Sequence, residues 1–157
     1  MNFRKLLNKE TSFIVVSGGV ATPLELDKVK FALTTQHMNS FLDSANLCVF
    51  VWGSSWQLFG PEDCVRLVNT ITGWGDFTID EMLLVGERRL NMLRAFNARE
   101  GIDRTADRLP KKFFKTLQGD GPSSGIALDI EEIMQAQEWY YEMSGWNLDS
   151  GNPTNDT

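Results

Sequence analysis

The chain has 157 residues, 42% of them hydrophobic, which is long enough for one domain with a sizeable core. Its formal net charge is −6, without the basic excess of a nucleic-acid-binding protein, so the run Lys111, Lys112 and Lys115 is interpreted as a solvated loop face. No stretch reaches the roughly 18 apolar residues of a membrane span, and the apolar run at residues 13–16 is too short for a signal peptide. We therefore expect a cytoplasmic globular protein that binds neither nucleic acid nor membrane.

The first predicted helix begins near Pro23 and runs towards Ala45. Apolar residues recur at helical spacing along one face of it. That face contains Phe31, Thr35, Met38 and Leu42. Thr35, Asn39 and Asp43 follow one another at intervals of one turn and form a polar stripe beside it. Such short polar side chains favour a face that contacts something specific, although a solvated face is the commoner case.

Three further helices are predicted. The second covers residues 61–72, because proline suits a first helical position and Gly73-Trp74-Gly75 follows. Thr78 and Glu81 form a capping box at the start of the third helix. Asp129 is an N-cap candidate for the fourth, which stops near Gly145.

The third helix has a wide apolar stripe, which predicts packing on more than one side. The stripe consists of Met82, Val85, Met92, Leu93 and Phe96. Gly86 interrupts this helix at a cost of about 1 kcal/mol relative to alanine. We therefore expect a neighbouring element to approach closely at Gly86.

The remaining segments give little strand signal. Residues 101–128 form a long loop, and its glycine-rich part at 119–125 lacks the preceding strand and the spacing of a phosphate-binding loop, so a flexible connector is expected. The polar tail from Asn147 is expected to be loosely ordered, and short strands are considered only near residues 13–16 and 49–51. The predicted fold class is all-α, a compact helical domain of about four main helices with long connecting loops.

Potential metal ligands are few. Two cysteines, Cys48 and Cys64, and one histidine, His37, cannot assemble a four-ligand zinc site, and nothing indicates a disulfide framework. His37 is interpreted as a helix-surface or packing residue. Most free cysteines are buried and inert, but Cys48 lies five residues after Asp43, and a carboxylate and a thiol at one helix end can hold two parts of a cofactor. If Cys48 is a ligand of an iron–sulfur cluster with four thiolates, the remaining ligands must come from outside this chain.

Three ordered stretches form a more specific pattern. The first is Asp43-Ser44-Ala45-Asn46-Leu47-Cys48. The second comprises residues 73–74, 86–97 and 99–101, and continues through Arg104, Asp107, Leu109 and Pro110. The third comprises residues 140–141, 145–146, 151 and 153–154. In order and spacing, from about Leu26 to Thr154, they resemble the C-terminal region of the tungsten-containing aldehyde ferredoxin oxidoreductases, whose motif D-x-x-G-L-C is similar to residues 43–48.

The resemblance implies an oxidoreductase that converts an aldehyde and water to a carboxylic acid at tungsten, or molybdenum, held by two pterins. Electrons then pass through a [4Fe-4S] cluster to ferredoxin. By this resemblance Cys48 is the fourth cluster ligand, Asp43 accepts hydrogen bonds from pterin N–H groups, and Leu47 contributes through its backbone. By helical spacing, Asn39 and Thr35 extend the same wall towards the cofactor.

Two departures from the family pattern matter. Asn46 stands where the motif has glycine, and asparagine is among the best substitutes where the backbone is left-handed. The family's other three cluster cysteines and its second acidic pterin-binding motif have no counterpart in this chain, and Cys64 matches no family position. An isolated chain is therefore expected to be inactive.

Two hypotheses follow. In the first, the chain is the C-terminal cofactor-binding part of an aldehyde oxidoreductase and acts only with an N-terminal portion carried by a separate chain. In the second, it is a truncated, cofactor-free helical module for structure or interaction. The expected organisation is an N-terminal extension at residues 1–25, the family-like helical domain at 26–154 and a tail at 155–157.

Overall fold

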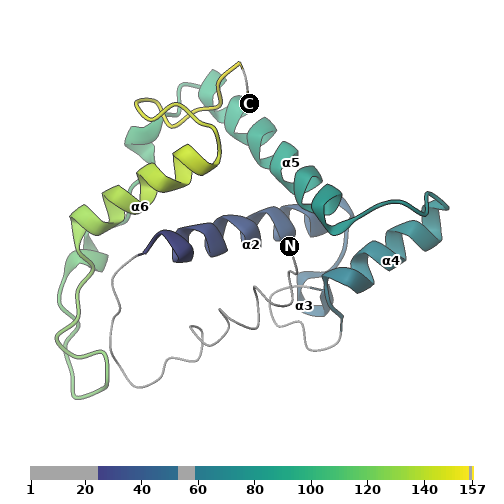
Figure 1. The fold of residues 1–157 in the computed structure, drawn as a ribbon. Coiled ribbons are helices and arrows are strands. Elements are labelled where there is room, and N and C mark those ends of the chain that lie inside the picture. Colours follow the sequence, from purple (N-terminus) through teal and green to yellow (C-terminus); the bar gives the residue numbers. More distant parts are fainter. Residues whose placement is uncertain (1–24, 53–58, 156) are drawn as a thin grey trace. The chain divides into compact units, whose positions relative to one another are not determined.

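The computed structural model describes residues 25–52, 59–155 and 157. These residues confirm the all-α fold class, because they contain helices and a single isolated bridge between Trp146 and Pro153 but no strand (Figure 1). The elements, in chain order, are α2 (Leu26–Ser44), α3 (Val49–Trp52), α4 (Pro61–Thr72), α5 (Ile79–Arg99), the 3-10 turns η2 (Arg104–Ala106) and η3 (Lys111–Phe114), and α6 (Ile130–Met143). No helix in the described part of the chain is long and apolar enough to cross a membrane.

The chain divides into two compact units. One contains Asp103–Thr154 and is grouped with the start of α2 up to Phe31. The other contains Ala32–Ile102, and therefore most of α2 together with α3, α4 and α5.

The core of the second unit is formed by side chains from three helices and one loop. Its buried members are Met38, Phe41, Leu42, Cys64, Phe77 and Met82. Phe77 comes from the loop between α4 and α5, which the side chain of Asn69 holds through two hydrogen bonds. The Asn69 amide donates to the Phe77 carbonyl at 2.9 Å and accepts from the Phe77 N–H at 3.0 Å. This pairing satisfies the loop backbone while the phenyl ring enters the core.

α5 crosses α2 at the glycine that the sequence singled out. A Cβ atom added to Gly86 would lie 1.9 Å from the carbonyl oxygen of His37. The backbones therefore meet at a distance that only glycine permits, which confirms the expected close approach and explains why the lower helix propensity of glycine is tolerated.

The predicted helix ends are confirmed. Thr78 and Glu81 form the capping box of α5, with the Thr78 N–H donating to the Glu81 carboxylate at 2.8 Å and the Glu81 N–H to the Thr78 hydroxyl at 3.2 Å. The Asp129 carboxylate accepts from the N–H groups of Glu131 and Glu132 at the start of α6. Gly73, at φ 73°, ends α4 in the left-handed conformation.

Three other expectations had different outcomes. Residues 49–51 are helical, as part of α3, so the prediction of a possible strand there was wrong. The N–H groups of Val51 and Trp52 donate to the Cys48 carbonyl and close a helical turn. The possible strand at residues 13–16 lies outside the described residues. On α5, Met82 is buried but Met92, Leu93 and Phe96 are exposed, so the wide stripe is packed only over the first half of the helix.

The tail after Asn147 is ordered, contrary to expectation. The Asn147 side-chain oxygen accepts from the N–H groups of Asp149 and Ser150 at 3.1 and 2.9 Å, and its carbonyl accepts from the Gly151 N–H at 2.7 Å. An asparagine that accepts from residues two and three positions ahead fixes a tight turn without regular secondary structure. A polar composition therefore did not imply a loose tail.

Candidate functional site

The segment from Asp43 to Cys48 folds as the C-terminal cap of α2. The N–H of Leu47 donates to the Leu42 carbonyl at 2.8 Å, and the N–H of Asn46 donates to the Asp43 carbonyl at 3.3 Å. Asn46 has a φ of 55°, in the left-handed region. This pair of bonds around one left-handed residue is the Schellman motif, in which the sixth residue normally packs against the first. Leu47 does pack against the core cluster that contains Leu42.

The cap leaves the thiol of Cys48 accessible. Cys48 is a free, exposed cysteine, directly before α3. α3 presents apolar surface beside it, since Phe50 is 89% exposed and Val49 and Val51 are also exposed. The interpretation of Cys48 as an ordinary buried thiol is therefore wrong, whereas Cys64 fits that description. Cys64 is fully buried in the core, and burial raises its thiol pKa to about 11.

Asp43 makes an ion pair with a residue on α5. A guanidinium nitrogen of Arg89 lies 3.2 Å from an Asp43 carboxylate oxygen. The same nitrogen, Nη1, donates to the hydroxyl of the buried Ser40 at 3.3 Å. The Asp43 side chain is 63% exposed, and a carboxylate has about four acceptor sites, so one ion pair leaves it acceptor capacity for a ligand.

The other predicted site residues lie on α2 and in the turn after it. Thr35 and Asn39 are half-buried on α2, two turns and one turn before Asp43, so helical geometry places the three on one face. Leu47 follows the cap, half-buried, and Cys48 follows Leu47. The structure therefore brings the helical stripe and the cysteine to the C-terminal half of α2 and the turn after it.

His37 does not belong to this polar stripe. It is half-buried, and burial lowers its pKa, an effect that attraction to Glu87 partly opposes. Its carbonyl faces Gly86 at the helix crossing. This partial burial agrees with the interpretation of His37 as a helix-surface or packing residue.

The fit of a metal centre can be tested on the donor groups. Within residues 25–52, 59–155 and 157 there is no group of three or more histidine, cysteine or carboxylate side chains that could hold a metal ion. The single exposed thiol of Cys48 suits one ligand position of a cluster but cannot form a four-thiolate site. The described residues thus fit a contribution to a shared centre and not a complete centre.

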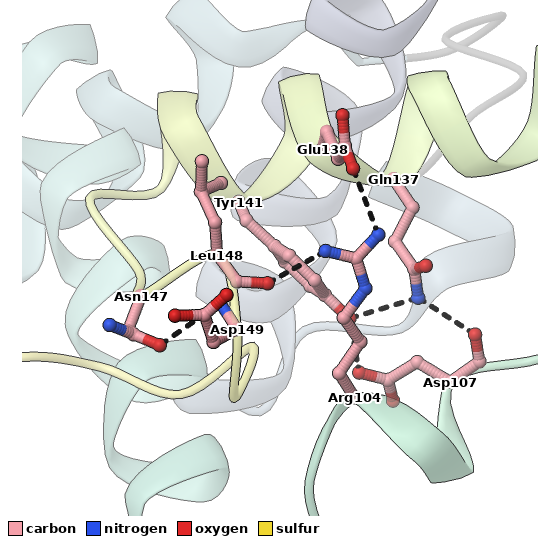
Figure 2. A network of polar contacts seen from close by, with 8 residues as sticks. All are labelled: Arg104, Asp107, Gln137, Glu138, Tyr141, Asn147, Leu148 and Asp149. Atoms are coloured by element: carbon pink, nitrogen blue, oxygen red, sulfur yellow. Dashed lines mark hydrogen bonds and ion pairs between the residues drawn. The ribbon is translucent and has the colours of Figure 1, made fainter.

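The first unit contains a second polar network, which Figure 2 shows from close by. Arg104 donates through one nitrogen to the Leu148 carbonyl at 2.7 Å and through another to the Glu138 carboxylate at 3.1 Å. The Tyr141 hydroxyl donates to the Asp107 carboxylate at 2.6 Å and accepts from the amide of Gln137 at 2.9 Å. Figure 2 shows Gln137, Glu138 and Tyr141 of α6 directed towards the segment that carries Arg104 and Asp107, with residues 147–149 beside them.

The ion-pair partners of the arginines lie on several different elements. The spacing of Arg88, Arg89, Arg94, Arg99 and Arg104 by itself favours a face of ion pairs with Glu87 and Glu100. Arg99 does pair with Glu100 at 3.0 Å, but Arg89 pairs with α2 and Arg104 with α6. Aromatic rings pack beside the network, with ring centroids of Tyr140 and Trp146 5.7 Å apart and of Tyr141 and Trp146 6.0 Å apart. Residues far apart in the sequence therefore form a polar network that connects α6 to the segments containing Arg104 and Leu148.

Comparison with known proteins decides the family. Residues 7–157 match the family model described as aldehyde ferredoxin oxidoreductase, domains 2 and 3. The chain belongs to the aldehyde ferredoxin oxidoreductase family. It is 35%, 34% and 33% identical, over 128 residues, to the tungsten-containing aldehyde ferredoxin oxidoreductases of Pyrococcus furiosus, Pyrococcus horikoshii and Thermococcus kodakarensis. Each alignment covers 81% of this chain and 20% of the relative, so the chain spans about a fifth of their length. No solved structure matches the chain.

Membership of the family confirms the resemblance on which the site was predicted. It does not test the individual site residues, and the boundary at residues 25 and 26 also stays a prediction. Sequence reasoning missed Arg89 as a partner of Asp43. The available signal was Gly86, because a close helix crossing brings the next turn of α5 near the next turn of α2.

Proposed function

We propose that this chain is the C-terminal cofactor-binding part of an aldehyde:ferredoxin oxidoreductase and acts together with the portion of the enzyme that its relatives carry outside the matched region. The observation that carries the proposal is the turn at the end of α2. It leaves the Cys48 thiol and the Asp43 carboxylate exposed, with only four residues between them. A helix end built only for stability has no need of an exposed thiol beside an exposed carboxylate.

The roles proposed for the chain's own residues come from the family resemblance, and this geometry is compatible with them. Cys48, as a thiolate, supplies one ligand of a [4Fe-4S] cluster, and three more come from outside the described residues. Asp43 accepts hydrogen bonds from N–H groups of a pterin, while the half-buried Asn39 and Thr35 continue the contact surface along α2. Leu47 anchors the turn to the core, so that the positions of Asp43 and Cys48 are fixed by the fold.

The bound groups supply the redox chemistry, with tungsten or molybdenum on two pterins oxidising the aldehyde and the cluster conducting electrons towards ferredoxin. This chain binds and orients those groups. The proposed partner is a cysteine-rich N-terminal oxidoreductase portion, and the proposed compartment is the cytoplasm, where thiols stay reduced.

The alternative is a cofactor-free structural or interaction module. It is favoured by the absence of a multi-residue metal site in the described part of the chain. In that case Cys48 and Asp43 are ordinary surface residues of a helical domain.

The two proposals differ in the iron content of the native assembly. The tagged chain is purified anaerobically from its own cells with everything that co-purifies, and iron, sulfide and tungsten are assayed. Cys48→Ala is compared with Cys64→Ala, which removes a thiol of the same chemistry from the core. We expect bound iron and sulfide in the wild type, a marked loss in Cys48→Ala and retention in Cys64→Ala.

A wild-type chain without iron or a partner, or a Cys48→Ala variant with undiminished iron, contradicts the cofactor-binding proposal. Either result favours the structural module. Thermal unfolding of both variants shows whether any loss of iron follows from loss of the fold.

A further inference from the structure

We infer that Arg89 is the positioning residue for Asp43 and holds its carboxylate in the orientation that accepts hydrogen bonds from a pterin. The inference rests on the proposed function and adds to it a residue from a different helix. Three features of the second unit support it: the helix crossing, the anchoring of the guanidinium, and the charge at the end of α2.

The helix crossing fixes where Arg89 can reach. Gly86 of α5 meets His37 of α2 backbone to backbone. Arg89 lies three residues after Gly86, and Ser40 lies three residues after His37, so each is about one turn from the contact. Asp43 follows after three more residues. Because backbone contact leaves no room for sliding, the distance from Arg89 to Asp43 is set by the fold.

The guanidinium of Arg89 is anchored at one end before it meets the carboxylate. Its Nη1 atom donates to Ser40, which is buried, and lies 3.2 Å from Asp43. The hydroxyl of Ser44 in turn donates to the Ser40 carbonyl at 2.9 Å. The Arg89 side chain is 35% exposed, against 63% for Asp43. A partly buried, anchored donor therefore holds a more exposed acceptor, which is the arrangement expected when the acceptor binds the ligand.

The negative charge of Asp43 at the end of α2 also favours a cationic partner. Asp43 is in the last turn of α2, where the helix dipole is negative and a carboxylate is unfavourable. Arg89 opposes that repulsion. An exposed ion pair contributes little to folding, so stability alone gives weak grounds for this arrangement, whereas fixing the direction of the carboxylate is something the pair can do.

The inference is tested on the native assembly after anaerobic purification. Pterin is released, oxidised to its fluorescent form and quantified, and iron is measured in the same sample. The variants are Asp43→Asn, Arg89→Gln, Arg89→Lys and the double variant Asp43→Asn/Arg89→Gln. Arg88→Gln is the matched control, because Arg88 is the exposed neighbour on α5. We expect Arg89→Gln to lower the ratio of pterin to iron by up to about fivefold, corresponding to about 1 kcal/mol. Arg89→Lys should restore part of it, and Arg88→Gln should leave it unchanged.

The double variant separates positioning from a structural effect. If Arg89 acts through Asp43, its loss adds nothing once Asp43 is replaced. Additive losses, or a parallel loss of iron and pterin in Arg89→Gln, overturn the inference. Retained pterin in Arg89→Gln together with loss in Asp43→Asn overturns it but leaves the proposed function standing. Retained pterin in Asp43→Asn, or a native assembly with no pterin, contradicts the proposed function itself and the inference with it.

Discussion

The backbone angle of Asn46 determines where the neighbouring side chains of the candidate site point. At φ 55°, Asn46 reverses the chain after α2, so that Leu47 turns into the core while Cys48 stays exposed. A residue with a branched Cβ would be strained at this angle, whereas asparagine is tolerated there. Asparagine at the position where the family motif has glycine is therefore compatible with this turn, and the expectation formed from the sequence agrees with the observed conformation.

His37 gives the stability of the chain a pH dependence that can be measured. Burial lowers its pKa from the usual 6.5, against a smaller opposing effect of Glu87. As the pH falls below about 6.5, the unfolded chain takes up a proton that the folded chain binds less readily, so folding stability decreases. Urea unfolding of the wild type should show lower stability at pH 5.5 than at pH 7.5. The decrease should be smaller in His37→Gln, and equal decreases in the two proteins would show that His37 is not its source.

Single residues were predictable where a local rule applied to them. The close approach at Gly86 and the left-handed backbone at Asn46 follow from local steric rules that the sequence already displays. The exposure of Cys48 and the pairing of Arg89 with Asp43 depend on which elements meet in space. The sequence marks a close approach at Gly86 but not which helix meets it there, so spacing alone did not identify the partner of Arg89.

At the scale of the elements, the crossing of α2 and α5 leaves no space for a larger side chain at Gly86. Gly86→Ala places a Cβ 1.9 Å from a backbone carbonyl, which cannot move without moving the whole helix. We expect the variant to lose about 2 kcal/mol or more of unfolding free energy, although alanine is the better helix former by about 1 kcal/mol. Urea unfolding measures the change. Gly121→Ala, with nothing within 4 Å of the added Cβ, is the control and should be nearly neutral. A neutral or stabilised Gly86→Ala would show that the helices do not cross at this point.

The polar network at α6 is expected to contribute to stability through hydrogen bonds and not through close packing. Tyr141→Phe keeps the buried ring but removes the hydroxyl that bridges Asp107 and Gln137. A hydrogen bond to a charged group typically contributes about 1.5–3 kcal/mol, so we expect a loss of that size in urea unfolding. Asp107→Asn and the double variant complete a thermodynamic cycle. Strictly additive losses would show that Tyr141 and Asp107 do not interact.

Helices were predicted well where capping and turn residues bounded them. The capping box of α5, the proline start of α4 and the aspartate cap of α6 are local signals, and each is observed. α3 was missed because residues 49–51 are β-branched or aromatic and favour a strand by composition. The turn before α3 overrides that preference, since the Cys48 carbonyl accepts from both Val51 and Trp52.

At the scale of the whole molecule, many large apolar side chains of the described residues are exposed. Large exposed side chains include Phe50, Ile71, Trp74, Met92 and Phe96. The curated relatives are about five times longer than the matched region. A chain that forms one part of a larger enzyme is expected to leave apolar side chains for the other part to cover.

The proposed assembly predicts which part of this surface is covered. A cluster that takes Cys48 as one ligand and three ligands from another polypeptide lies at their interface, so the side chains beside Cys48 contact that polypeptide. Phe50 is the most exposed of these, at 89%, and replacing so exposed a residue should change the stability of the chain by no more than about 0.5 kcal/mol. We therefore expect Phe50→Gln to fold normally but to retain less co-purifying polypeptide and less iron. Ile71→Gln, on α4 and 74% exposed, is the matched control and should retain both. If both variants retain polypeptide and iron equally, the interface lies elsewhere. If both lose them equally, the association is non-specific hydrophobic binding and not a defined contact at α3.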